Sequence, residues 1–378
     1  MNPDLAASAL SAEAALARVQ GAGTLPDPIF RLQLKDIDRA RGSIEPTRVN
    51  RIDYTVEQEF PLWGKRNLAR SVAAANAAQT VAGRDQMALE LVAAIKTAFG
   101  DYYAAYEAGA IAGDIKRTLD LMAEVAQGRY EQGLGDQQDA IMASVEAAHL
   151  QTELLKREAD QRRAAARLNA LLNRPIEAPL ARPETLPPLP AADLMDLQQL
   201  MGRLNATSPI LRAQGAAIEA ASGAQALAKK NWYPDVALGL SVVDQNRRWQ
   251  GYEAMVSVRI PINGTLRQAE ISATTAELGA ARNRRDAVAA RAREQLESAF
   301  WNFDEARRIA TVLHDTHIPQ TELALKSAVA GYQQNRVDLL TLLEAQRRAF
   351  QNRLEHLTYL VNQERAVAEI EKLLGGTL

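Results

Sequence analysis

The sequence predicts a mainly α-helical protein with a small β part, in which long helical hairpins are joined to four short strands. Three observations support this fold class. Alanine supplies much of the 47% hydrophobic content and aromatic residues only 5%, as is typical of long helices packed through small side chains. Apolar and polar residues alternate in four separate stretches, as they do in strands with two different faces. A strand-to-helix hinge, Glu59 to Arg66, occurs a second time at Arg259 to Leu266.

The first half of the chain begins with a predicted helix over residues 1–22 and a strand after Pro26. Residues 36–48 are charged and form a predicted loop, and a second strand runs from about residue 50 to Phe60. Pro61 suits the end of that strand because it cannot donate a ladder hydrogen bond, and Gly64 allows a tight exit into a helix.

The helix after this hinge is unusually long. No proline interrupts residues 65–130, and at about 1.5 Å per residue this segment spans on the order of 100 Å. A turn follows at Tyr130 to Asp136, and a second helix returns to about Leu172. Residues 175–190 contain six prolines and form a predicted extended linker.

The second half repeats this plan, with a helix from Ser208, a strand from Tyr233 and the second hinge at Pro261 and Gly264. Pro26 and Pro234 are 208 residues apart, Gly64 and Gly264 are 200 apart, and Tyr130 and Tyr332 are 202 apart. Such spacings indicate an internal duplication, with a first repeat at 1–187 and a second at 188–378. The two repeats form one intertwined domain. Pro319 interrupts only the second ascending helix, which predicts a kink and a more mobile second hairpin.

Composition excludes several functions. The net charge is −2, with acids and bases interspersed, so nucleic-acid binding is not expected. There is no cysteine, no signal peptide at Met1 to Asp4 and no apolar run of about 18 residues. Phosphate-loop, nucleophile-elbow and zinc-protease motifs are absent, so neither an enzyme nor a cofactor is predicted.

Four strands are too few to close a barrel, for which roughly eight is the usual minimum. Oligomerisation is therefore expected, and three copies of the chain would provide twelve strands and a hollow ring of helices. The alternative is a soluble coiled-coil scaffold, which would contain almost no strand.

The order of these elements resembles the TolC family of outer-membrane channels. The resemblance rests on the strand opening with Pro26-Asp27, the segment Phe60 to Arg66, the turn after Tyr130 and the stretch Leu168 to Pro175, and it covers almost the whole chain in two copies. The hinge is most similar to the CzcC-like branch, which serves heavy-metal cation efflux. Family members normally begin with a signal peptide, often a lipobox cysteine, and a further helical segment, so the resemblance implies that this chain lacks that front end.

The resemblance implies a passive exit duct in the outer membrane that extends into the periplasm. It would be a homotrimer with a twelve-stranded β-barrel and an α-barrel, and it would work with a periplasmic adaptor and an RND-type inner-membrane pump. The cargo that this interpretation implies is heavy-metal cations. Drug efflux and type I protein secretion stay open, because the pump selects the cargo.

The same resemblance places the functional residues at the helical tips. Asp139, Tyr332 and Glu344 match an acid, a gating tyrosine and an inward-facing acid, while Arg336 lies one position from the family's gate arginine. The turns are expected at Tyr130, Gly133, Asn335 and Asp338. Three copies of these acids would form a ring that attracts cations, and Tyr or Arg hydrogen bonds could hold it shut. The alternative is that the tyrosines pack against the turns and the acids lie on a solvated face.

Two further groups complete the expectations. His314 and His317 have helical i, i+3 spacing, but a single such pair on a polar helix is usually surface, so no metal site is predicted. Twelve apolar strand residues are expected to face lipid: Phe30, Leu32, Leu34, Ile52, Tyr54, Val56, Val236, Leu238, Leu240, Tyr252, Val256 and Val258.

Overall fold

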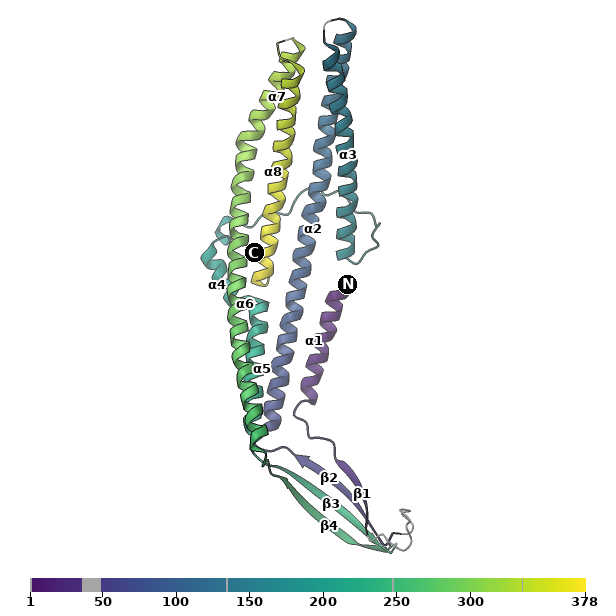
Figure 1. The fold of residues 1–378 in the computed structure, drawn as a ribbon, viewed down its shortest axis with the longest axis vertical. Coiled ribbons are helices and arrows are strands. Elements are labelled where there is room, and N and C mark those ends of the chain that lie inside the picture. The colour runs from purple at the N-terminus through teal and green to yellow at the C-terminus, as the bar shows by residue number, and fades with distance from the viewer. Residues whose placement is uncertain (1, 36–48, 134, 247, 335) are drawn as a thin grey trace. The chain divides into compact units, whose positions relative to one another are not determined.

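The computed structural model describes residues 2–35, 49–133, 135–246, 248–334 and 336–378 (Figure 1). The elements of the first half are α1 (Pro3–Gly21), β1 (Ile29–Lys35), β2 (Arg51–Phe60), α2 (Lys65–Glu131) and α3 (Gln137–Leu171). Those of the second half are α4 (Leu197–Thr207), α5 (Pro209–Lys230), β3 (Asp235–Gln245), β4 (Arg248–Arg259), α6 (Gly264–Val312), α7 (Ile318–Gln333) and α8 (Leu339–Leu374). The predicted mainly helical fold with four strands is therefore confirmed.

The chain forms two compact units, and each contains residues from both halves of the sequence. One unit comprises residues 1–7, 85–209 and 290–378, and the other comprises residues 8–84 and 210–289. Helices α2 and α6 run through both units without a break. The second unit contains the whole sheet, while the first contains the helical hairpins α2–α3 and α7–α8.

The sheet is antiparallel throughout, with the strand order β1-β2-β3-β4 (Figure 1). Its register places Phe30 opposite Val56, Val56 opposite Leu240 and Leu238 opposite Val256. Because side chains alternate between the faces of a strand, the twelve apolar residues expected to face lipid share one face. That face is largely exposed: Val56 is 50% exposed, and Val256 68%. The opposite face is polar and partly buried, with Asp53 only 2% exposed.

The hairpin ends are held together by a shared apolar cluster. It contains buried residues of all four helices that meet there: Leu119, Met122 and Ala126 of α2, Ala143 and Leu150 of α3, Ala328 and Tyr332 of α7, and Leu339, Leu342 and Leu343 of α8. Small alanines among these leucines let the helices approach closely. The cluster joins the two hairpins as one packed body.

Between α6 and α7 the helix contains a π-helical turn, Leu313–His317, directly before Pro319. Pro319 lies in the first turn of α7, where its missing N–H costs little. The irregularity predicted from Pro319 is therefore present, in the form of an inserted residue in the hydrogen-bond ladder. No comparable interruption occurs in α2, which is continuous over 67 residues.

Candidate functional site

The helical tips bring Arg129, Tyr332 and Asp139 together. Arg129, in the last turn of α2, donates from Nη1 to the backbone carbonyl of Tyr332 at 2.9 Å, and its guanidinium carbon lies 4.9 Å from the centre of the Tyr332 ring. Tyr332 belongs to α7 and is only 4% exposed. Arg129 therefore connects the first hairpin to the second, through a charged hydrogen bond and a cation–π contact.

The carboxyl group of Asp139 interacts electrostatically with Arg129 and Tyr332. Partial burial raises its pKa above the ordinary value, and the negative charges of Asp136 and Asp338 raise it further, while Arg129 acts in the opposite direction. The pKa of Tyr332 is also raised, first by burial and then by the charge of Asp139. The charge of Asp139 thus acts on Tyr332, and Asp338 brings a third carboxylate from the second hairpin.

The other predicted tip residues have local roles or lie at the surface. Gly133 has a φ of +69° and donates to the carbonyl of Tyr130 at 3.0 Å, so it provides the left-handed turn after α2. Asp338 caps α8 by accepting a hydrogen bond from the Thr341 amide at 2.9 Å, which lowers the pKa of its carboxyl. Tyr130, Glu344 and the Arg336 side chain are exposed, and Asn335 lies outside the described residues.

The polar face of the sheet carries charges of both signs in direct contact. Arg31 pairs with Glu57 at 2.9 Å, and Arg259 pairs with Glu59 at 3.1 Å. The buried Asp53 contacts both Lys35 and Arg51, and Arg51 continues to Glu253. These contacts involve four cations and four anions, so their charges balance. This face therefore offers a polar wall with little net preference for ions of either sign.

The first hinge is anchored to the start of β3. Lys65 is only 7% exposed, and its ammonium group donates to Asp235 Oδ2 at 2.7 Å and to the carbonyl of Tyr233 at 2.9 Å. The amide of Leu62 donates to the other oxygen of Asp235 at 3.2 Å, and Trp63 Nε1 donates to the carbonyl of Pro234 at 2.8 Å. Four hydrogen bonds thus fix the junction between strand and helix.

The second hinge has a different local structure. Gly64 has the left-handed φ of +79° that the sequence predicts for a tight exit, and Trp63 before it has a φ of +63°. Gly264, in contrast, begins α6 without a left-handed backbone, so the prediction that its freedom is needed for the exit is wrong there. The amide of Ile262 donates to the carbonyl of Ile260, and Ile262 is 90% exposed.

The two hairpins also meet through charged groups farther from the tips. Asp101 of α2 accepts hydrogen bonds from Arg167 of α3 and Arg365 of α8. Lys96 of α2 pairs with Glu371 of α8. Burial raises the pKa of the nearby Glu364, the charge of Lys96 lowers it, and the charge of Glu371 raises it. Lys96 is thus a cation between two buried carboxylates.

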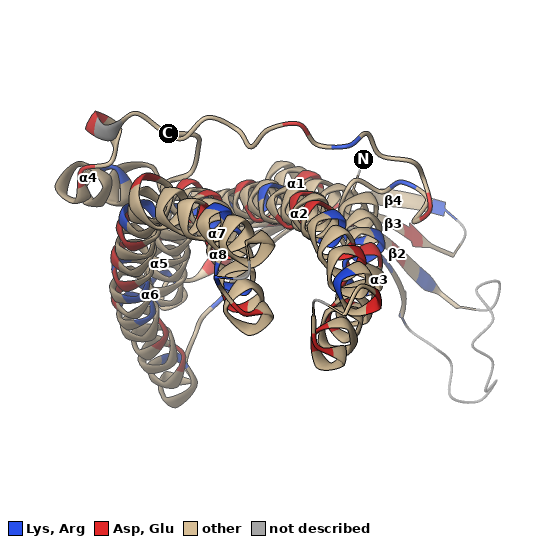
Figure 2. Cartoon of the chain, turned by 90° about the horizontal axis from the view of Figure 1, so that it is seen from above, with Lys and Arg blue, Asp and Glu red and all other residues tan. Residues whose placement is uncertain are grey.

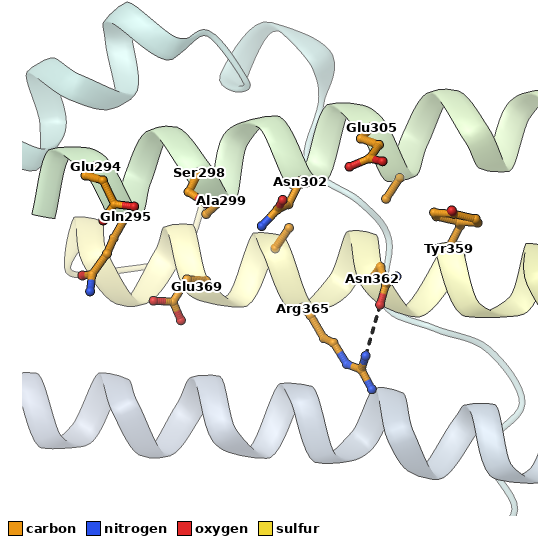
Figure 3. A pocket seen from close by; sticks show the side chains of 12 residues that line it. Glu294, Gln295, Ser298, Ala299, Asn302, Glu305, Tyr359, Asn362, Arg365 and Glu369 are labelled. Atoms are coloured by element: carbon orange, nitrogen blue, oxygen red, sulfur yellow. Dashed lines mark hydrogen bonds between the residues drawn. The ribbon is translucent and has the colours of Figure 1, made fainter. Parts of the chain in front are cut away.

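A groove of about 600 Å³ lies between α6 and α8 (Figure 3). Glu294, Glu305 and Glu369 line it, and Arg365 donates to Asn362 of the same helix, α8, at 3.1 Å. Its lining carries three carboxylates and one arginine, whereas acids and bases are interspersed along the helices in general (Figure 2). The groove contains no arrangement of nucleophile, base and oriented donor that would indicate catalysis.

The histidines do not form a metal centre. His314 contacts Asp315 at 2.8 Å, and its ring lies 5.7 Å from that of His356, rather than sharing a partner with His317. Within the described part of the chain, no group of three or more His, Asp or Glu residues could hold a metal ion. No described helix is both long and apolar enough to cross a membrane.

A four-stranded sheet with one apolar face, joined by hinges to long helical hairpins, is the architecture of TolC-like outer-membrane channels. Residues 1–174 and 200–376 match the family described as outer membrane efflux protein, and the chain belongs to this family. The predicted resemblance is therefore confirmed. Membership of this family of transport ducts also agrees with the expectation that the chain is not an enzyme.

Known relatives extend over nearly the whole chain. The cobalt-zinc-cadmium resistance protein CzcC of Cupriavidus metallidurans is 24% identical over 99% of this chain and 87% of its own length. The outer-membrane channel OprN has a TM-score of 0.85 at 19% identity, covering 99% of this chain and 87% of its own. The outer membrane protein VceC of Vibrio cholerae has a TM-score of 0.85 at 17% identity, covering 100% of this chain and 94% of its own.

Proposed function

We propose that this chain is the exit duct of a tripartite system that exports heavy-metal cations across the outer membrane. The observation that carries the cargo assignment is the match to a cobalt-zinc-cadmium resistance protein over 99% of the chain. The duct itself is passive. A periplasmic adaptor contacts it, and an inner-membrane pump supplies the energy for export.

The working form is a homotrimer. One chain provides four strands in a sheet whose outer strands, β1 and β4, each have an edge that pairs with no other described strand. Three copies would join these edges into a closed twelve-stranded sheet, with the apolar face toward lipid and the polar face toward the lumen. The balanced charges of the polar face would let ions pass without strong selection there.

Selection and closure take place at the tips. Asp139 and Asp338 of three copies would place six carboxylates around the narrow end, which favours cations over anions. Arg129 holds the second hairpin through Tyr332, and release of this contact would let the hairpins separate. Glu344, which is exposed, would add negative charge to the pore wall.

The cargo is tested in the host bacterium by deleting this chain and measuring growth on zinc, cobalt and cadmium salts and on a panel of hydrophobic drugs. The proposal predicts metal sensitivity that the wild-type chain restores, with unchanged drug sensitivity. Drug sensitivity alone would assign the duct to drug efflux, the first alternative left open by the sequence. Secretion is the remaining alternative, and a lost extracellular protein would indicate it. The soluble scaffold is disfavoured by the four strands.

A further inference from the structure

The two hinges of this chain occupy equivalent places in its repeated element order, but among the described residues only the first is hydrogen-bonded to a segment that leads into another strand. The first hinge lies on the segment Tyr233 to Asp235, which begins β3. In the repeated order, Asp27 is the equivalent of Asp235, and Ile262 is the equivalent of Leu62. The partner of the second hinge should therefore be the segment Leu25 to Asp27.

The Pro26 carbonyl already accepts a hydrogen bond from Gln58 at 2.7 Å, but the side chains of Ile262 and Asp27 are free among the described residues. Ile262 is 90% exposed, against 41% for Leu62, and Asp27 is exposed as well. Among the described residues Asp27 makes no hydrogen bond or ion pair, whereas Asp235 has two partners in the first hinge. Asn263 uses its Oδ1 to cap α6 through the Leu266 amide at 3.0 Å, so its side-chain amide remains able to donate.

The register of the sheet makes the same pairing possible between copies. β2 pairs with β3 so that Glu59 is opposite Ala237 and Val56 is opposite Leu240. In the repeated order, β4 is the equivalent of β2, and β1 is the equivalent of β3. If β4 pairs in the same register with β1 of a second copy, Arg259 lies opposite Ile29 and Val256 lies opposite Leu32. The apolar faces then coincide, and Glu253 lies opposite Lys35, which is a favourable charge pair.

We propose that the second hinge docks on Asp27 of a neighbouring copy of this chain, as the first hinge docks on Asp235 of its own. Ile262 covers the start of β1 in that copy, and the Asn263 side-chain amide donates to the Asp27 carboxylate. This proposal rests on the homotrimer of the proposed function, and it identifies the residues that join each copy to the next at the base of the helices.

The two junctions differ at one decisive position. Lys65 supplies a buried ammonium group to Asp235, but its equivalent in the second hinge is Thr265, which carries no charge. The junction between copies is consequently weaker than the junction within a copy. Of the six strand-to-helix junctions in a trimer, the three between copies are the ones that can loosen when the helices move.

A double-mutant cycle tests this asymmetry. Thr265→Lys should restore the missing ion pair with Asp27 and raise the temperature at which the detergent-solubilised trimer dissociates by about 2–4 °C. The gain should disappear in an Asp27→Asn background, and Thr265→Gln, which lacks the charge, should not produce it. An equal gain with and without Asp27 would overturn the proposal.

Cross-linking tests the contact itself, and it is simplified by the absence of native cysteine. The variant Ile262→Cys with Asp27→Cys, treated with a short bismaleimide, should give covalent dimers and trimers on a denaturing gel, while either single variant stays monomeric. Trimers by light scattering without these products, and without the Thr265–Asp27 coupling, would refute the docking but leave the duct intact. A protein that is monomeric throughout would refute both.

Discussion

Replacing Arg129 by alanine should open the helical tips. The substitution removes a charged hydrogen bond of 2.9 Å to the Tyr332 carbonyl and the contact of the guanidinium with the Tyr332 ring. A hydrogen bond from a charged group contributes about 1.5–3 kcal/mol, here at the lower end because Arg129 is only half-buried, and a cation–π contact at an exposed site contributes about 0.5–1 kcal/mol. Together they amount to about 2 kcal/mol in each chain.

That free energy corresponds to about a 30-fold shift in the equilibrium between joined and separated hairpins, since about 1.4 kcal/mol is a factor of ten. The assay is the single-channel current of purified protein in planar lipid bilayers, measured as conductance and open probability. Arg129→Ala should increase both.

Two controls separate this effect from a general loss of charge. Arg129→Lys keeps the cation but loses the planar contact with the ring, and it should have a smaller effect. Arg336→Ala removes an exposed tip arginine whose side chain has no described partner, and it should leave the current unchanged. If Arg129→Ala behaves as wild type, or if Arg336→Ala opens the channel equally, the contact with Tyr332 does not hold the tips together.

Four further predictions follow from the same structure. Acidification should favour the joined tip. Burial and the neighbouring carboxylates raise the pKa of Asp139 in the joined tip, and this shift is lost if the hairpins separate, so the joined form binds a proton first as the pH falls; Asp139→Asn should remove this dependence in a bilayer pH titration. The pair of changes Asp139→Asn and Glu344→Gln should reduce the cation preference read from reversal potentials, and unchanged potentials would leave both as ordinary surface acids. Leu238→Lys should destabilise the membrane-inserted form by roughly 2–4 kcal/mol if residue 238 lies near the midplane of the bilayer. Gln33→Lys, on the opposite face of the sheet, should assemble normally. Equal assembly of the two variants would count against the assigned faces. Lys96→Met should lower the free energy of unfolding by about 1–2 kcal/mol, because it leaves Glu364 and Glu371 together without their cation. The further change Glu364→Gln should recover part of that loss in a thermal melt.

The elements of the fold could be predicted because each depends on local patterns. Alternation identified the strands, and the absence of proline identified the long helix α2, which ends one residue after Tyr130. Internal spacing located the second hinge, since Pro261 and Gly264 repeat Pro61 and Gly64 at a constant offset. Local patterns are read directly from neighbouring residues, so no knowledge of the packing was needed.

The contacts between distant segments could not be predicted in this way. Arg129 is an ordinary arginine at a helix end, and only its position opposite Tyr332, 203 residues away, makes it important. The burial of Lys65 beside Asp235 depends likewise on the two halves meeting, although its place in a repeated hinge was a usable signal. Pro319 indicated an irregular helix, but no local pattern specified a π-helical turn at Leu313–His317.

The mass of the detergent-extracted protein, measured by light scattering with the detergent contribution subtracted, tests the central claim most directly. A closed duct needs the strands of several copies, so the account predicts a particle with three times the mass of one chain. A homogeneous particle containing one or two chains, from protein that retains its helical and β-strand signals in circular dichroism, would contradict it.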